Sequence, residues 1–149
     1  MPRRRVLVIA LAVIVFLAIS LELARYLSAP SAERNHVYDV LKDAARGDAG
    51  RVIARLQGCR EDPVCVAQTT ATVAKVKADG DVKILSYESP TAYALGTKTA
   101  KARVAWAMVD KDGLPVVQCV TVQRKWSFTS GGSVSLRRLS APIGNEAGC

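Results

Sequence analysis

The chain has 149 residues, and an apolar N-terminal segment with its flanks occupies roughly the first 28. The rest is the length of one globular domain, which argues against a multi-domain protein. Four of the 21 basic and one of the 13 acidic residues lie in the N-terminal segment, so residues 29–149 hold 17 basic and 12 acidic side chains, a net charge of +5. Beside a bilayer, this charge fits anionic lipid or a cell-wall polymer as a partner, and equally a plain solvated surface.

The segment Val6–Ala24 predicts one membrane span. It carries a single charge in 19 residues, Glu22 near its distal end. A helix of that length reaches about 29 Å, close to the thickness of the hydrocarbon core. Arg3–Arg5 precede the span, whereas only Arg25 follows it closely. Because positive charge stays on the cytoplasmic side, we expect a single-pass cell-membrane protein with a cytoplasmic N-terminus and an extracytoplasmic C-terminal domain.

A cleaved signal peptide is the competing interpretation of this segment. It requires small residues at positions −3 and −1 of the cleavage site. Cleavage after Ala24 places Glu22 at −3, and cleavage after Ala29 places Leu27 there. Both sites are poor. We therefore expect residues 1–28 to remain as a cytoplasmic tip and transmembrane anchor, with residues 29–149 as the extracytoplasmic domain.

The four cysteines all lie beyond the anchor, at Cys59, Cys65, Cys119 and Cys149. An even number in an oxidising compartment predicts two disulfides. Of three possible pairings we favour Cys59–Cys65, which are local neighbours, and Cys119–Cys149, where a Gly- and Asn-containing segment can fold back onto a strand. The C-x5-C spacing, with the only histidine, His36, 23 residues before it, does not fit a zinc site. We expect no metal and no cofactor.

Three helices are predicted after a short linker at Ser28–Ala32. They cover Glu33–Arg46, Asp48–Leu56, and Asp62 to about Asp79-Gly80. Asp48 is a candidate N-cap, and Asp62-Pro63 combines a capping carboxylate with proline at the first helical position. The face of the third helix is expected to comprise Val66, Thr70, Val73 and Val76.

Beyond Val82 the apolar period changes from helical to alternating, which is typical of strands. The candidate strands are Val82–Glu88, Tyr93–Leu95, Lys101–Val109, Val116–Trp126 and Val134–Ile143. Turn signals stand at Asp112-Gly113 and Ser130–Gly132, and Arg137-Arg138 requires a bulge. The core face is expected to comprise Ala102, Val104, Trp106, Val120 and Val122, and the opposite face Cys119, Thr121, Gln123 and Lys125. Helices followed by an antiparallel meander predict an α+β fold.

This order of elements resembles exported bacterial members of the nuclear transport factor 2-like (cystatin-like) superfamily, over residues 33–143. The similar stretches are Ala102–Trp106, the hairpin at Asp110–Leu114, and Val116–Arg124 leading to a bulged last strand. The resemblance implies a cystatin-like cone of two to three helices packed on a curved antiparallel sheet. Members include enzymes, ligand binders and non-catalytic envelope subunits, among them accessory subunits of lipid-import (mammalian-cell-entry type) and secretion systems, so the fold alone does not fix the function.

Two groups of residues are candidate binding sites. Tyr93 and Trp106 are positioned to line the mouth of a cone-shaped pocket, with core packing as the default interpretation. A basic cluster of Arg124, Lys125, Arg137 and Arg138 forms if their strands pair. Its candidate partners are anionic lipid or an acidic protein surface, and a solvated strand edge is the alternative. Nucleic acid is a poor partner for an exported domain.

The sequence offers no set of catalytic residues. His36 is expected on a helix surface, Asp110 and Asp112 in a turn and not a calcium loop, and Asp39 and Asp43 on a solvated helix face. We therefore expect a non-catalytic extracytoplasmic binding or assembly module whose partner is an envelope protein or a lipid. The alternative is a small-molecule or lipid-binding protein, or an enzyme, that uses the interior of the cone.

Overall fold

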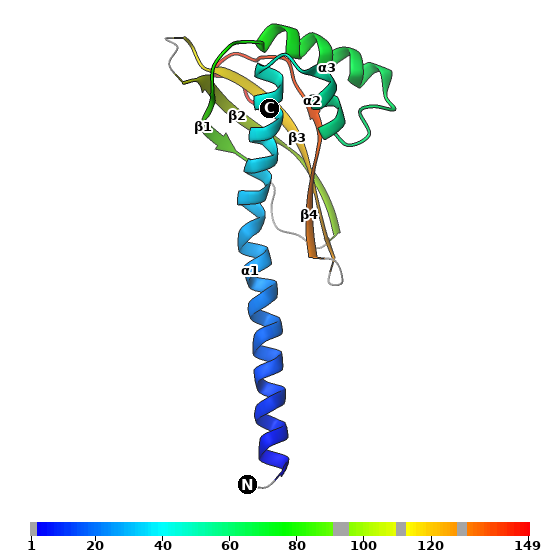
Figure 1. Cartoon of the computed structure of the whole chain (residues 1–149), viewed down its shortest axis with the longest axis vertical. Helices are drawn as coiled ribbons and strands as arrows, with labels where there is room; N and C mark the ends of the chain where they lie inside the picture. The colour runs from blue at the N-terminus through cyan, green and yellow to red at the C-terminus, as the bar shows by residue number, and fades with distance from the viewer. Residues whose placement is uncertain (1–2, 91–95, 110–112, 128–130) are drawn as a thin grey trace.

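The computed structural model describes residues 3–90, 96–109, 113–127 and 131–149. Within them, three helices are followed by a four-stranded antiparallel sheet, which confirms the predicted α+β order. The elements are α1 (Arg3–Ala45), α2 (Ala49–Arg55), α3 (Pro63–Val76), β1 (Val82–Glu88), β2 (Gly96–Met108), β3 (Val116–Ser127) and β4 (Gly131–Leu139). Figure 1 shows α1 as a long stem whose upper part lies against the sheet, with α2 and α3 at the end away from the N-terminus.

Helix α1 runs without a break through the predicted linker Ser28–Ala32, so that prediction is wrong. Pro30 lacks an N–H and disfavours a helix interior by about 3 kcal/mol, which is why a break was expected. The helical residues on both sides outweigh this one lost bond, since Ala is the strongest helix former and proline-containing helices are the known exception to the breaker rule. The apolar segment and the domain therefore share one 43-residue helix.

The lower part of α1 is apolar and largely exposed. An 18-residue window within Arg4–Ala24 has a mean hydropathy of 3.0, and none of its residues is buried inside the domain. The 21 residues Arg4–Ala24 extend about 31 Å, long enough to cross a bilayer. A signal sequence near an N-terminus has the same length and composition.

Helices α2 and α3 begin where the sequence predicts. The Asp48 carboxylate accepts a hydrogen bond from the backbone N–H of Arg51, and the Asp62 carboxylate accepts from those of Val64 and Cys65. These bonds satisfy donors that a helix start otherwise leaves open.

The buried face of α3 differs from the predicted one. It comprises Cys65, Thr69, Thr72, Val73 and Val76. Val73 and Val76 are buried as predicted, whereas Thr70 is exposed and Val66 only partly covered, so the predicted face is correct only toward the C-terminal end of the helix. At the other end, the bond of Cys65 to Cys59 holds the first helical turn toward the interior.

The sheet is a meander with the strand order β1-β2-β3-β4, and every neighbouring pair is antiparallel. Thr121 pairs with Arg138 and Val122 with Leu136, so Arg137 is the extra residue of the predicted bulge. A second bulge, not predicted, lies between Ile84 and Ser86 on β1.

Several strand boundaries differ from the predicted ones. Strand β2 begins at Gly96 and not at Lys101, and β4 covers Gly131–Leu139 and not Val134–Ile143. Gly131 and Gly132 therefore belong to β4 and not to the predicted turn. Ile143 still reaches the sheet through an isolated bridge to Val117. The predicted strand Tyr93–Leu95, and the predicted turns in part (110–112 and 130), lie outside the described residues.

The core fills the space between the helices and the inner face of the sheet. Each predicted core-face position on β2 and β3 is at most 1% exposed: Ala102, Val104, Trp106, Val120 and Val122. They belong to the same cluster as Val37, Leu41 and Val52 from α1 and α2.

Both predicted disulfides are present. The Cα atoms of Cys59 and Cys65 are 5.3 Å apart, and those of Cys119 and Cys149 are 5.7 Å apart. The first bond closes the loop between α2 and α3. The second joins the outer face of β3 to the segment after β4, as the alternation along β3 predicts.

Candidate functional site

A buried charged cluster lies where the upper stem meets the sheet. Glu33 on α1 is 0% exposed. Its carboxylate accepts hydrogen bonds from the Tyr87 hydroxyl on β1 and from Nε of Arg124 on β3, the latter at 2.5 Å. Arg124 is itself largely covered, with 13% of its side chain exposed. The three residues therefore tie the helix to two different strands. We call Glu33, Tyr87 and Arg124 the buried triad.

The electrostatics of the buried triad do not favour proton transfer to or from a substrate. Burial raises the pKa of Tyr87 well above its usual range, and the neighbouring Glu33 carboxylate raises it further. Tyr87 thus stays protonated and acts as a donor. The carboxylate of Glu33 is balanced by the guanidinium of Arg124, and it already accepts from two donors. This arrangement suits a charge-neutral clamp between helix and sheet better than a general acid or base.

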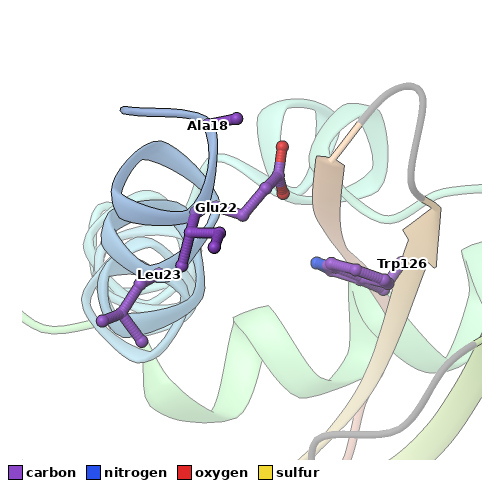
Figure 2. Close-up of a pocket in the computed structure, with 5 residues that line it drawn as sticks. Ala18, Glu22, Leu23 and Trp126 are labelled. Carbon is purple, nitrogen blue, oxygen red and sulfur yellow. The ribbon is translucent and has the colours of Figure 1, made fainter. Parts of the chain in front are cut away.

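Below the buried triad, an open groove separates the stem from the end of the sheet. Its lining residues are Ala18, Ile19, Glu22 and Leu23 of α1 and Trp126 of β3, around a space of about 530 Å³. Figure 2 shows the Glu22 side chain extending from α1 into the space between the helix and the strand, where the Trp126 indole faces it. The groove is apolar apart from the Glu22 carboxylate and the indole nitrogen.

The Trp126 ring lies against a glycine of the neighbouring strand. Trp126 pairs with Gly96 on one side and Gly132 on the other. A Cβ atom added at Gly132 would lie 3.2 Å from Cδ1 of Trp126, whereas one added at Gly96 would meet nothing within 4 Å. Because Gly132 has no side chain, the ring can lie directly against the β4 backbone.

The predicted basic cluster does not form one surface. Arg124 points to the inner face and pairs with Glu33, whereas Lys125 is exposed on the outer face. Arg137 donates to the side-chain oxygen of Gln123 and to the carbonyl of residue 57. Arg138 forms an ion pair with Asp62 at 2.8 Å. Three of the four predicted contacts with an anionic partner are therefore occupied within the chain.

The predicted pocket residues divide in a similar way. Trp106 is 1% exposed and its indole N–H donates to the Gln118 side chain at 2.9 Å, while the Gln118 amide donates to the carbonyl of Ser140. It is a core residue, which agrees with the default interpretation, and lines no surface opening. Tyr93 lies outside the described residues.

Other polar candidates occupy ordinary structural places, with one correction. His36 is exposed on α1. The predicted solvated face is wrong for Asp43, which is 3% exposed, whereas the Asp39 side chain is 49% exposed. Both carboxylates bind Arg55 of α2, at 2.6 Å for Asp43 and 3.3 Å for Asp39. Hydrogen bonding to Asp43 raises the pKa of Arg55. The pair joins α1 to α2, a contact that one helix read alone does not reveal. Asp110 and Asp112 lie outside the described residues.

Three residues of the site, Glu33, Tyr87 and Trp126, were not predicted from the sequence. A signal for part of the site exists in β3, where the inward alternation of Val120 and Val122 continues to Arg124 and Trp126. An inward arginine demands a buried counter-charge. Nothing local identifies that partner, because Glu33 lies 91 residues earlier in the chain.

No protein-family model, curated protein or solved structure matches this chain. Across residues 3–90, 96–109, 113–127 and 131–149, no group of three His, Cys, Asp or Glu side chains is placed to hold a metal ion.

Proposed function

We propose that this protein is a membrane-tethered, extracytoplasmic module without catalytic activity that contributes to an envelope assembly. The observation that carries the proposal is the continuity of α1, whose apolar part and domain part form one helix from Arg3 to Ala45. Such a stem holds the domain at a fixed height and orientation on the membrane, which is useful for assembly and unnecessary for a freely diffusing enzyme.

The uncleaved anchor is supported by the contacts of the stem. Cleavage after Ala24 or Ala29 would remove the α1 side of the groove that faces Trp126. Cleavage would also place a new chain end at most eight residues before Glu33, the residue on which the buried triad depends. Retention of the anchor leaves both arrangements intact.

The orientation rests on charge and on the disulfides. Arg3–Arg5 precede the span and favour a cytoplasmic N-terminus. Two disulfides in the domain suit an oxidising compartment on the other side. The cell membrane, with the domain outside, satisfies both conditions.

The non-catalytic assignment rests on what fills the sheet's inner face. Apolar side chains of β2 and β3 pack against α1 and α2, and the inward charges of Glu33 and Arg124 neutralise each other. The four-stranded antiparallel meander against a long helix is compatible with a cystatin-like cone, in which the interior would be closed by this packing. A partner would then bind outside, where Val64, Leu85 and Leu114 are exposed apolar side chains of the domain.

The proposal is tested in native membranes with a photo-crosslinking residue at Leu85 or Leu114. We expect the intact mass of the extracted chain to include the anchor. We also expect one envelope protein to be captured repeatedly at one of these positions, with capture lost when the domain is destabilised by Cys149→Ser. A chain beginning after Ala24 would refute the anchor. A stoichiometric small molecule retained by the purified protein in native mass spectrometry, without any protein adduct, would favour the alternative of a ligand-binding interior.

A further inference from the structure

The end of the sheet lies beside the apolar stem and not above it. Trp126 on β3 faces Ala18, Ile19, Glu22 and Leu23, all of which belong to the apolar stretch Arg4–Ala24. Figure 1 shows this end of the sheet reaching down alongside α1, on the side toward the N-terminus. A bilayer that surrounds the stem must therefore also meet this end of the sheet.

We propose that the sheet end is a second membrane contact, in which Trp126 inserts at the bilayer interface and Lys98 and Lys125 bind anionic lipid headgroups. The sheet end is defined here as the described residues 96–98, 125–127 and 131–133. The proposal rests on the proposed function, since it needs the anchor to be retained. It assigns a partner, the lipid surface, to a groove that would otherwise face water.

The depth of the contact follows from the length of the helix. Ala18 precedes Ala24 by six residues, or about 9 Å along the axis. If Ala24 stands at the edge of the hydrocarbon core, the residues that face Trp126 lie between that edge and about 9 Å inside it. The headgroup region adds roughly 5–8 Å outside the core on each side. The Trp126 indole thus lies in the outermost part of the hydrocarbon core, directly below the headgroup region and beside the interface, at which tryptophan is enriched because its ring is apolar and its N–H is polar.

The backbone beside Trp126 is paired, which matters because the hydrocarbon core penalises unpaired backbone groups. Among the described residues, the outer edges of β2 at residues 96–98 and of β4 at residues 131–133 have no strand partner, so they must stay at the level of the headgroups, where water reaches them. Trp126 lies on a central strand with partners on both sides, Gly96 on β2 and Gly132 on β4. Its neighbours in the ladder are also paired, Lys125 with Thr97 and Ser133.

The charges at the sheet end favour an anionic lipid surface. Lys98 and Lys125 are both exposed, and the residues 96–101, 124–127 and 131–135 contain no acidic side chain. Lysines near an anionic leaflet each strengthen membrane association several-fold. A lysine close to the interface also extends its stem along apolar surface while its ammonium stays among the headgroups.

The test uses the full-length chain reconstituted in vesicles of phosphatidylcholine with or without phosphatidylglycerol. Tryptophan emission is measured with lipids brominated at a shallow or a deep acyl position. We expect quenching by both, stronger from the shallow bromines. The matched control is Trp126→Phe, which leaves Trp106 as the only indole, and because Trp106 is 1% exposed in the core its emission should not be quenched.

The lysine contacts are tested with one double variant at the sheet end and one matched control double variant. With phosphatidylglycerol present, the quenching of Trp126 should increase, and Lys98→Gln/Lys125→Gln should lose that increase. Lys75→Gln/Lys83→Gln removes two exposed lysines from α3 and β1, away from the sheet end, and should behave like wild type.

Two results would overturn the proposal and leave the anchor in place. One is an unquenched Trp126 in a chain that resists carbonate extraction. The other is quenching that appears only at low protein density and gives way to crosslinks between copies at Trp126, which would assign the groove to a second copy. A chain that carbonate releases from the vesicles would refute the proposed anchor itself, and the membrane contact with it.

Discussion

The two faces of the same sheet are held by different means. Along β3, Val120, Val122 and Arg124 point inward and are covered by the helices, while Thr121 and Lys125 point outward. The inner face is stabilised by apolar burial and by one buried ion pair. Among the residues that the structure describes, no helix covers the outer face (Figure 1).

A tail and a disulfide take the place of a helix layer on the outer face. Cys119 is bonded to Cys149, and its backbone exchanges hydrogen bonds with Ser140. The Arg103 guanidinium donates to the carbonyls of Asn145 and Ala147 in the same segment. The comparison teaches that a small domain can close one face by packing and the other by a covalent bond, because the polar outer face offers little apolar surface to bury.

The largest loss of stability is expected when the buried ion pair of the inner face is removed. Glu33→Ala leaves the Arg124 guanidinium covered and without its counter-charge, which we expect to cost about 3–5 kcal/mol of unfolding free energy. The measurement is urea unfolding of the full-length chain in detergent micelles, followed by circular dichroism. A loss below about 1 kcal/mol would mean that water reaches the buried triad.

A double variant separates the charge from the packing. Glu33→Leu with Arg124→Met replaces both charges by apolar side chains of similar volume and should recover most of the lost stability. If the double variant is as unstable as Glu33→Ala, the hydrogen bond from Tyr87 and not the ion pair carries the effect.

The second largest effect is expected on the outer face. The Cys119–Cys149 bond spans 30 residues, and loop entropy assigns such a bond about 3.7 kcal/mol. Cys119→Ala/Cys149→Ser should therefore lower the urea midpoint strongly while the inner core persists. Faster proteolysis within residues 140–149 than within the helices would locate the loss on the outer face. Equal protection of this segment in variant and wild type would show that the hydrogen bonds of Arg103 suffice without the disulfide.

Sequence patterns predicted the elements well where the cause is local. The Asp62-Pro63 start, the alternation along β3 and the extra residue at Arg137 each depend on a few neighbouring residues. The disulfide Cys119–Cys149 was also predictable, because the alternation places Cys119 outward, where only a returning segment can reach it.

Features that depend on distant residues were not predictable. Glu33 appeared as the first residue of a separate helix, and its burial depends on Arg124 and Tyr87 from two strands that follow much later. The continuity of α1 through Pro30 depends on the number of helical residues that flank the proline. Rules that treat proline as a helix breaker do not take this number into account. The position of Trp126 beside Ala18 depends on the path of the whole sheet past the stem.

The two faces can also be compared on the single strand β3, through one inward and one outward residue. Val122→Ala removes two methyl groups from a side chain that is 0% exposed, and it should cost about 2 kcal/mol through lost transfer energy and a small cavity. Thr121→Ala changes the adjacent outward residue and should cost less than about 1 kcal/mol. Both are measured by urea unfolding under identical conditions. Equal losses would show that the outer face is also packed.

The smallest effect on stability is expected for the partly exposed ion pair between Asp62 and Arg138. This pair contrasts with the buried pair of Glu33 and Arg124. The hydrogen bond from the backbone N–H of Cys65, followed by that from Arg138, holds the pKa of Asp62 below its usual value. A carboxyl whose pKa is lowered in the folded state adds stability above the unfolded value near 3.9, and this contribution is lost as the pH falls through the lower folded value.

Asp62→Asn keeps a capping acceptor but carries no charge. The difference in urea midpoint between wild type and Asp62→Asn should thus be small and constant from pH 7 to about pH 5, and should vanish below the folded pKa. Arg138→Ala should remove only part of it, since the helix N–H groups remain. A pH-independent difference would mean that Asp62 acts through the shape of the cap and not through its charge, and the exposed pair would then contribute nothing comparable to Glu33 and Arg124.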